Sequence, residues 1–457
     1  PRPSDRRAHH QGLFEGRLGR AVATQPGQAR LARLPADRGR THRARARPRR
    51  HRKHQRRRAP LTTDSATLPE TETRPTTLRA IICVIIAVTF FGLAYGYSLP
   101  VLSLIMEREG LSSTLIGLNT ATSSAAVLVF GPFVPRLLVR FGLRIPIFVS
   151  IIVSTALIVP IAFTEPLYAW FPLRFVLGGA IFIALIATDI WVTQGASAKT
   201  RGRLVAIYGA AVAGGVAAGP LLVSFTGAEG YAPFWTAGGL LAFSTIPMLL
   251  AFGPSPHMSR SARPPLLRFI SVVPVATVAV IIFGVMDASI LALLPIYGVR
   301  EGMTDEASVK LVSIVLGGSV VLQLPIGYLA DRFPKQAVLF GLGLIGAAAA
   351  AIYPAVFHTI PALFICLFVL GGCVTGLYVV SLAILGDRFS GGALAAAVTL
   401  FTMMLSAGTT TGPVLSGIAM QAYDPHGLPA TISGAMLMVP IVGLVTWMVW
   451  LGRGRKL

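Results

Sequence analysis

From residue 79 onward the chain is a succession of apolar stretches that are each about 20 or more residues long. A helix of about 20 residues crosses a hydrocarbon core about 30 Å thick. Only 13% of the residues are charged and 54% are apolar, whereas a soluble domain carries about 25% charged residues. The sequence therefore predicts an all-α integral membrane protein and argues against a soluble enzyme.

We count twelve such spans, and the connections between them are short with one exception. The spans lie at approximately residues 80–106, 112–135, 145–164, 167–194, 204–226, 231–252, 269–298, 308–330, 336–357, 360–385, 395–420 and 429–451. The longer connection, Gly253 to Arg268, follows the sixth span. We therefore predict an N-terminal six-helix bundle at residues 79–252, a cytoplasmic linker at 253–268 and a C-terminal six-helix bundle at 269–452.

The net charge of +22 would ordinarily suggest a nucleic-acid partner. Most of it lies in residues 1–78, which hold 20 Lys and Arg against 6 Asp and Glu. This segment has no apolar period that could bury a core, so we predict a disordered basic tail and no nucleic-acid partner. The alternatives are a polybasic segment on an anionic leaflet, a weak nucleic-acid arm, or a segment that is not natural coding sequence, because the first Met is Met106.

The positions of Lys and Arg predict the orientation, because positive charge is retained in the cytoplasm. With the N-terminus inside, the cytoplasmic connections hold fifteen Lys and Arg residues, and the outside connections hold Arg108, Arg300 and Lys310. We therefore expect a multi-pass protein of the cell inner (plasma) membrane with both termini cytoplasmic.

The two halves show internal similarity. Gly219-Pro220 in span 5 corresponds to Gly412-Pro413 in span 11, and Gly178-Gly179 in span 4 corresponds to Gly371-Gly372 in span 10, both at an offset of 193 residues. Arg140-Phe141 corresponds to Arg332-Phe333 at an offset of 192. Three matches at nearly one offset indicate a duplicated six-span unit with pseudo-symmetric halves.

Two motifs carry a resemblance to a known family. Gly327-Tyr-Leu-Ala-Asp331-Arg332 after span 8 and Gly215-Val-Ala-Ala-Gly219-Pro220 in span 5 resemble motifs of the major facilitator superfamily. The similarity covers roughly residues 79–452, and Asp189-Ile-Trp191 resembles a bacterial subgroup of uncharacterised or efflux-type permeases. The resemblance implies alternating access, in which two bundles rock about a central site lined by spans 1, 4, 7 and 10.

The first motif implies a cytoplasmic gate formed by Gly327, Asp331 and Arg332. Gly327 would allow two helices to approach, and Asp331 would cap a neighbouring helix or accept a hydrogen bond from an Arg. The equivalent stretch after span 2 has Pro135 in place of the Gly and Val139 in place of the Asp. The alternative for Asp331 is a loop carboxylate that pairs with Arg332 in water.

The Gly-Pro motif resembles one associated with antiporters in the superfamily. Its residues are Gly215, Gly219 and Pro220 in span 5 and Gly408, Gly412 and Pro413 in span 11. Small residues at four-residue spacing pack helices closely, and Pro bends a helix. We expect a tight hinge between the two bundles, with ordinary membrane packing as the alternative.

Three ionisable residues lie within the spans, where a charge costs several kcal/mol unless it faces a cavity or a partner. Arg174 lies about 10 Å from the outer end of span 4 and Asp287 about 16 Å from the outer end of span 7. We predict that Asp287 is the proton-coupling carboxylate and Arg174 its charge partner. Asp189, about 22 Å beyond Arg174, serves either transport or the span 4–5 loop.

Polar residues elsewhere in the spans could line a cavity, although in membrane helices such residues more often bond between helices. They are Tyr95, Tyr97, Asn119, Gln323, Tyr378 and Thr409–Thr411. The cysteines Cys83, Cys366 and Cys373 lie in apolar runs and are predicted to be packing residues. No phosphate loop and no Cys or His metal spacing occurs, so we expect no enzyme activity, no cofactor and no metal.

These features predict a secondary active transporter for a small, partly apolar molecule, with proton-coupled efflux as the favoured mode. The expected partners are a small-molecule substrate, protons and the lipid bilayer, and the expected state is a monomer. One alternative is an importer or facilitator of a sugar, carboxylate or other metabolite. Another is a membrane receptor or scaffold that transports nothing.

Overall fold

A computed structural model describes residues 78–161, 163–164, 167–195, 201–227, 229–251, 273–389 and 391–452. The predicted basic tail, except Leu78, and the predicted linker at 253–268 lie outside these residues. All of the regular secondary structure in the described ranges is helical.

The described residues of the first half form six long helices and four short helical segments. The long helices are α1 (Leu78–Arg108), α2 (Ser113–Phe130), α4 (Arg144–Ile161), α5 (Trp170–Gly195), α6 (Arg201–Ala218) and α8 (Ala232–Leu250). The short segments are α3 (Val134–Phe141), η1 (Leu167–Ala169), η2 (Gly219–Leu222) and α7 (Val223–Thr226).

The part of the second half that the structure describes forms six long helices. They are α10 (Pro274–Arg300), α11 (Asp305–Arg332), α12 (Lys335–Ile352), α13 (Ile360–Arg388), α14 (Gly391–Ala422) and α15 (Gly427–Gly452). Across the described ranges, eleven helical segments are long and apolar enough to cross a membrane, and α14, with 32 residues, completes the predicted twelve. The predicted all-α fold class is confirmed.

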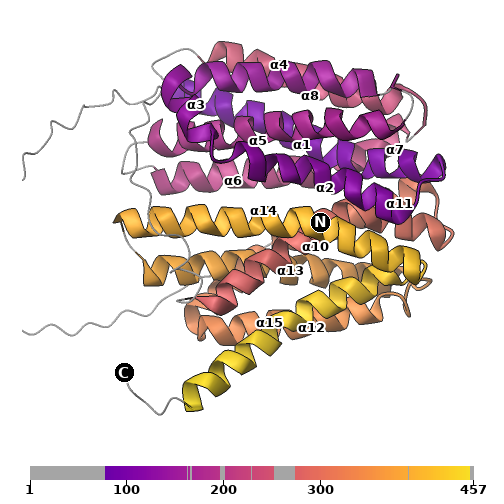
Figure 1. Cartoon of the computed structure of the whole chain (residues 1–457), viewed down its shortest axis with the longest axis vertical. Coiled ribbons are helices and arrows are strands. Elements are labelled where there is room, and N and C mark those ends of the chain that lie inside the picture. Colours follow the sequence, from indigo (N-terminus) through magenta and orange to yellow (C-terminus); the bar gives the residue numbers. More distant parts are fainter. Residues whose placement is uncertain are drawn as a thin grey trace, which may run out of the picture. The chain divides into compact units, whose positions relative to one another are not determined.

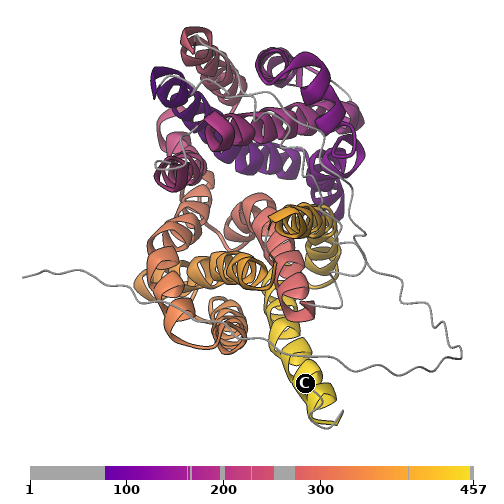
Figure 2. The same ribbon diagram turned by 90° about the vertical axis from the view of Figure 1, so that its left-hand side faces the viewer.

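The same packing scheme occurs in both halves. In the first half α1 packs on α6, α2 on α5 and α4 on α8; in the second half α10 packs on α14, α11 on α13 and α12 on α15. Most of the long helices run roughly parallel in Figure 1, whereas α10 and α15 cross them obliquely, and the view in Figure 2 shows two groups. We call these groups the N-terminal and the C-terminal bundle.

Equivalent close glycine contacts in the two halves show which residues of the repeat correspond to one another. A Cβ atom on Gly178 of α5 would lie 2.7 Å from the Cα of Ser123 in α2, and one on Gly371 of α13 would lie 2.7 Å from the carbonyl carbon of Val315 in α11. Gly178 and Gly371 differ by 193 residues and Ser123 and Val315 by 192. We call two residues repeat positions of one another when they are 192 or 193 residues apart and lie on corresponding helices of the two halves.

Two details differ from the sequence prediction. The short helix α3, which contains Pro135 and Val139, follows α2 and was not predicted. Span 5 is not one helix, because α6 ends at Ala218 and a 3-10 turn begins at Gly219-Pro220. Proline has no backbone N–H and fixes φ, so it ends the α-helical hydrogen-bond pattern there. At the repeat position Pro413 lies inside the continuous helix α14.

Candidate functional site

Arg174 of α5 lies inside the N-terminal bundle and is 1% exposed. Its Nη1 donates a hydrogen bond to the Oδ1 of Asn119 at 2.9 Å, and its Nε donates to the Oγ of Ser123 at 3.3 Å. Ser123 in turn donates to the backbone oxygen of Arg174 at 3.1 Å. Asn119 and Ser123 are four residues apart on α2 and therefore lie on one face of that helix. The guanidinium is thus held by neutral oxygens.

Asp287 of α10 lies on the side of the C-terminal bundle that faces the N-terminal bundle. Tyr95 of α1 lies close enough to interact electrostatically with both Asp287 and Arg174. Asp287 is partly exposed, and none of the ion pairs among the described residues joins it to Arg174. The predicted pair is therefore not in direct contact in this conformation, and Tyr95 lies near both members.

Asp189 of α5 is exposed and lies nearer the predicted cytoplasmic end. It accepts a hydrogen bond from the Thr193 side chain, and it lies within electrostatic range of Tyr208 in α6 and of Tyr378 in α13. Because Tyr378 belongs to the C-terminal bundle, Asp189 faces the other bundle. The Tyr208 hydroxyl lies 3.1 Å from the Thr188 hydroxyl and is hydrogen-bonded to it.

An aromatic cluster lies within the C-terminal bundle. The ring of Tyr378 lies 5.0 Å, centroid to centroid, from Phe283 of α10 and 5.5 Å from Phe401 of α14. Phe283 precedes Asp287 by four residues, so the two side chains lie on one face of α10. The cluster therefore lies on the same face of α10 as Asp287.

The structure shows the predicted gate motif without contacts between helices. A Cβ atom on Gly327 would meet no atom within 4 Å. Asp331 is exposed, and it takes part in none of the ion pairs found in the described ranges. The Nη1 of Arg332 donates to the hydroxyl of Tyr328 at 3.0 Å. The gating role stays a prediction for a conformation in which the cytoplasmic side is closed.

The Gly-Pro motif of α6 lies inside the N-terminal bundle. A Cβ atom on Gly215 would lie 2.5 Å from the backbone oxygen of Thr89 in α1, and one on Gly219 would lie 2.6 Å from the carbonyl carbon of Gly96 in α1. Pro220 is buried in the 3-10 turn that follows. These contacts join two helices of the same bundle, and the turn at Gly219–Leu222 also contacts α11 of the C-terminal bundle. The hinge between the bundles stays a prediction.

The Gly-Pro motif of α14 also packs within its own bundle, and it makes one further contact with the other bundle. Cβ atoms on Gly408 and Gly412 would collide with the backbone of α10, at 2.5 Å from the Cα of Val285 for Gly412. Pro413, the next residue, points its carbonyl at Gly117 of α2, where a Cβ atom would overlap it. One face of α14 thus packs within its bundle, and the face of Pro413 packs against the other bundle.

Ion pairs at the predicted outer end join the two bundles. The Nε and Nη2 atoms of Arg300 donate to the two carboxylate oxygens of Glu107 at 2.7 and 3.0 Å, and Nη1 donates to Asp424 at 2.5 Å. Arg108 pairs with Asp305. These pairs connect α1 to α10 and α11. The sequence predicted Arg108 and Arg300 only as charges of the outside connections.

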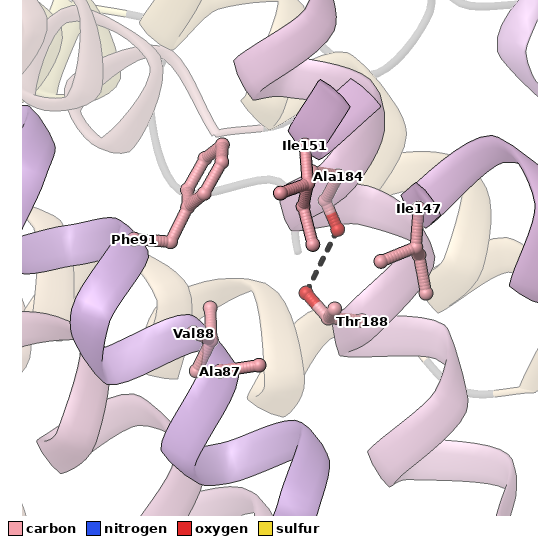
Figure 3. Close-up of a pocket in the computed structure, with 7 residues that line it drawn as sticks. All are labelled: Ala87, Val88, Phe91, Ile147, Ile151, Ala184 and Thr188. Carbon is pink, nitrogen blue, oxygen red and sulfur yellow. Dashed lines mark hydrogen bonds between the residues drawn. The ribbon is translucent and has the colours of Figure 1, made fainter. Parts of the chain in front are cut away.

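A small apolar pocket lies inside the N-terminal bundle between α1, α4 and α5 (Figure 3). It is lined by Ala87, Val88, Phe91, Ile147, Ile151, Ala184 and Thr188. Its one polar side chain, Thr188, donates to the backbone oxygen of Ala184 at 2.8 Å, drawn as the dashed line. None of the predicted ionisable site residues lines this pocket, so it is separate from the sites around Arg174, Asp287 and Asp189.

Two repeated helical bundles with ionisable groups facing one another across their boundary define a membrane transport protein. The sequence profile of the Major Facilitator Superfamily matches residues 84–317 and 305–456. The chain belongs to this superfamily, as its motifs predicted, and it is a multi-pass membrane protein.

Relatives and solved structures agree with this membership. The chain is 27% identical over 357 residues to the uncharacterized MFS-type transporter YfkF of Bacillus subtilis, covering 75% of this chain and 89% of that one. It is 26% identical over 363 residues to an uncharacterized MFS-type transporter of Enterobacter, covering 76% and 91%.

Two solved structures show the same fold. A nucleoside transporter, NupG, superposes with a TM-score of 0.67 at 14% identity and covers 80% of this chain and 99% of its own. A D-xylose-proton symporter superposes with a TM-score of 0.62 at 20% identity and covers 80% and 97%.

Proposed function

We propose that this protein is a proton-coupled exporter of a small, partly apolar molecule in the inner membrane, with both termini cytoplasmic. The observation that carries the proposal is Asp287, an acid within a membrane-spanning helix that faces Tyr95 of the opposite bundle, which in turn lies within electrostatic range of Arg174. An ionisable residue at that depth is costly and is normally retained for transport. A receptor or scaffold would have no use for it.

Asp287 is proposed to carry the proton. Tyr95 lies across from it, within electrostatic range of both Asp287 and Arg174. When the bundles rock, the distance from Asp287 to Arg174 changes, and so does the free energy of the charged carboxylate relative to the protonated one. Proton binding is thereby coupled to the conformation that exposes the site, which is the requirement for active transport.

Export is favoured over import by the Gly215 to Pro220 stretch and its repeat in α14, which resemble the antiporter motif. Close packing of α6 on α1 and of α14 on α10 makes each bundle a rigid body. Rigid bundles suit an exchange in which the protein moves only between two loaded states.

The test is transport in proteoliposomes with an imposed pH gradient, measured for wild type and Asp287→Asn. Asn mimics the protonated carboxylate, so Asp287→Asn should lose gradient-driven transport and retain exchange between equal pools. Arg174→Ala should impair both activities. Normal gradient-driven accumulation by Asp287→Asn would remove Asp287 from this role and leave Asp189 as the residue to examine.

The direction of transport is tested with the same vesicles. Reversing the sign of the pH gradient should reverse the direction of net substrate movement. An exporter moves substrate against the inward proton flow, whereas a symporter moves it with that flow, so the sign of the correlation separates the two.

A further inference from the structure

We propose that His426 is a proton sensor at the predicted outer end, and that the two bundles close more firmly there when its ring is protonated. His426 lies between α14 and α15, in the loop that joins these helices. The proposal concerns how the pH outside sets the conformation, and it depends on neither the substrate nor the direction of transport.

The partner of His426 is Glu301, which follows α10 directly. The Glu301 side chain is 16% exposed, so its carboxylate is largely shielded from water. Among the described residues no lysine or arginine pairs with it. The Tyr297 hydroxyl is hydrogen-bonded to it, and the Nδ1 of His426 lies 3.6 Å from its Oε1. The positive charge that pairs with Glu301 is therefore that of a histidine, which exists only when the ring is protonated.

The repeat positions explain why Glu301 has no arginine partner. Arg300 and Glu301 lie 193 residues after Glu107 and Arg108, so α1 and α10 end with the same two charges in reverse order. A symmetric closure would pair Arg300 with Glu107 and Arg108 with Glu301. The structure forms the first pair, but Arg108 pairs with Asp305 of α11. The closure is therefore asymmetric, and the second pair is missing.

The loop that carries His426 also takes part in the contact between the bundles. Asp424 accepts a hydrogen bond from the Nη1 of Arg300 at 2.5 Å, and Glu107 of α1 accepts from the Nε and Nη2 of the same guanidinium. Closure thus brings Glu107 to one positive charge, on Arg300, and two negative charges, on Asp424 and Glu301. A protonated His426 cancels the excess negative charge and weakens the repulsion of Glu107. Proton binding and closure therefore favour one another.

The other titratable groups around His426 were compared by residue type. Besides the carboxylates and arginines already named, they are Tyr423, Tyr297, Tyr353 and His358. Tyrosines, carboxylates and arginines ordinarily change charge outside the range of about pH 5 to 8, in which histidine changes charge. His358 contacts Phe357, which packs on Tyr297. It is the group that an experiment has to separate from His426.

The experiment measures the distance between two spin labels by pulsed electron paramagnetic resonance at about pH 5.5 and about pH 8, on either side of the histidine range. The labels are placed at Tyr168→Cys and Ile360→Cys in the full-length chain, with the native cysteines replaced by alanine. Both positions are exposed, and they lie at the predicted outer ends of different bundles. The variants are His426→Gln, His426→Lys and Glu301→Gln, and the matched control is His358→Gln.

The expected results follow from the charge at position 426. In wild type, the fraction of molecules with the longer distance, open at the outer end, should rise about three- to tenfold from the acidic to the alkaline pH. His426→Gln, which is always neutral, should show the high fraction at both pH values, and His426→Lys, which is always charged, the low fraction. Glu301→Gln should lose most of the pH dependence, and His358→Gln should keep it.

A wild-type distance distribution that does not change with pH would overturn the proposal, as would an equal pH dependence in His426→Gln. Loss of the pH dependence in His358→Gln alone would assign the sensor to that residue and also overturn it. Opposite fractions in His426→Gln and His426→Lys would show that the charge matters, because a merely structural role of the ring would be lost in both. None of these measurements involves transport, so each result leaves the proposed function to its own test.

Discussion

The N-terminal and C-terminal bundles share their helix contacts and differ in their polar residues. Arg174 and Asn119 hydrogen-bond to one another in the N-terminal bundle. Their repeat positions hold Leu367 and Leu311, which are 0% and 1% exposed. The same backbone arrangement is thus filled once by a hydrogen-bonded cation and once by two leucines.

Other repeat positions differ between the bundles as well. Asp287 of the C-terminal bundle corresponds to Tyr95 of the N-terminal bundle, and these two residues lie near one another across the boundary. Tyr208 corresponds to Phe401. The glycines and apolar side chains are shared by the two bundles, whereas the ionisable and hydrogen-bonding residues differ between them.

The largest effect on transport is expected when Arg174 and Asn119 are both replaced by leucine, the residue at their repeat positions. The double variant Arg174→Leu/Asn119→Leu should lower transport by about 100-fold or more, because a buried Arg in a membrane helix is a functional residue. Its thermal stability should stay near that of wild type, because replacing buried charged groups by apolar residues is often neutral or stabilising.

The single variant Asn119→Leu tests the stability part of this prediction. Asn119→Leu alone leaves the Arg174 guanidinium with Ser123 as its remaining side-chain partner among the described residues. It should cost about 1 to 3 kcal/mol of stability because a buried donor is left unsatisfied. Thermal unfolding followed in detergent measures both variants, and a double variant less stable than the single one would contradict the comparison.

The second prediction concerns the shared glycine contacts. Gly178→Ala and Gly371→Ala each bring a Cβ atom onto the backbone of the neighbouring helix. Each should destabilise its bundle by about 1 to 3 kcal/mol, the usual cost of overpacking. Gly214→Ala and Gly317→Ala are the controls, one in each bundle, because a Cβ atom there meets nothing within 4 Å.

The controls should be neutral or slightly stabilising, by up to about 1 kcal/mol, because alanine is the better helix former. Thermal unfolding measures all four variants. Unequal losses from Gly178→Ala and Gly371→Ala would show that the two bundles do not share this packing to the same degree.

The third prediction tests how the bundles are joined at the predicted outer end. The side chains of Arg300 and Glu107 are 20% and 17% exposed, so their bidentate pair is partly shielded from water. Arg300→Gln should raise the population that is open at that end by about tenfold, since a charge-assisted contact between bundles is lost.

The measurement is the labelling rate of a cysteine at Ala292, which is buried in α10, in a chain whose native cysteines are replaced by alanine. Lys335→Gln is the control, because it breaks an ion pair within the C-terminal bundle. An equal rise in both variants would assign the effect to general loosening.

The smallest effect is expected at the predicted gate. There Asp331 of the second half corresponds to Val139 of the first half. Asp331→Asn should weaken a contact that exists only when the cytoplasmic side is closed, and so shift the protein toward inward-facing states. A cysteine at Thr277 should then become about two- to fourfold more reactive from the cytoplasm, in proportion to that population. An unchanged labelling rate would argue against a gate role for Asp331.

Much of the architecture could be predicted from the sequence. Apolar stretches of membrane length and matches such as Gly178 with Gly371 gave the helices and the duplication, because both depend on local composition. The bonding of Arg174 could also have been sought, since Asn119 and Ser123 are polar residues four positions apart in an apolar span. The ion pair of Arg300 with Glu107 could not, because the two residues lie 193 positions apart.

The sequence by itself determined the number of spans, the repeat and the family, since each follows from hydropathy and short motifs. The tertiary structure decided which helix each motif touches. It packed Gly215 and Gly408 against helices of their own bundles and joined Arg300 of α10 to Glu107 of α1. The physical reason is that hydropathy specifies that a helix enters the membrane, where every apolar face is equally compatible with lipid. Only close packing selects the face that meets a particular neighbour.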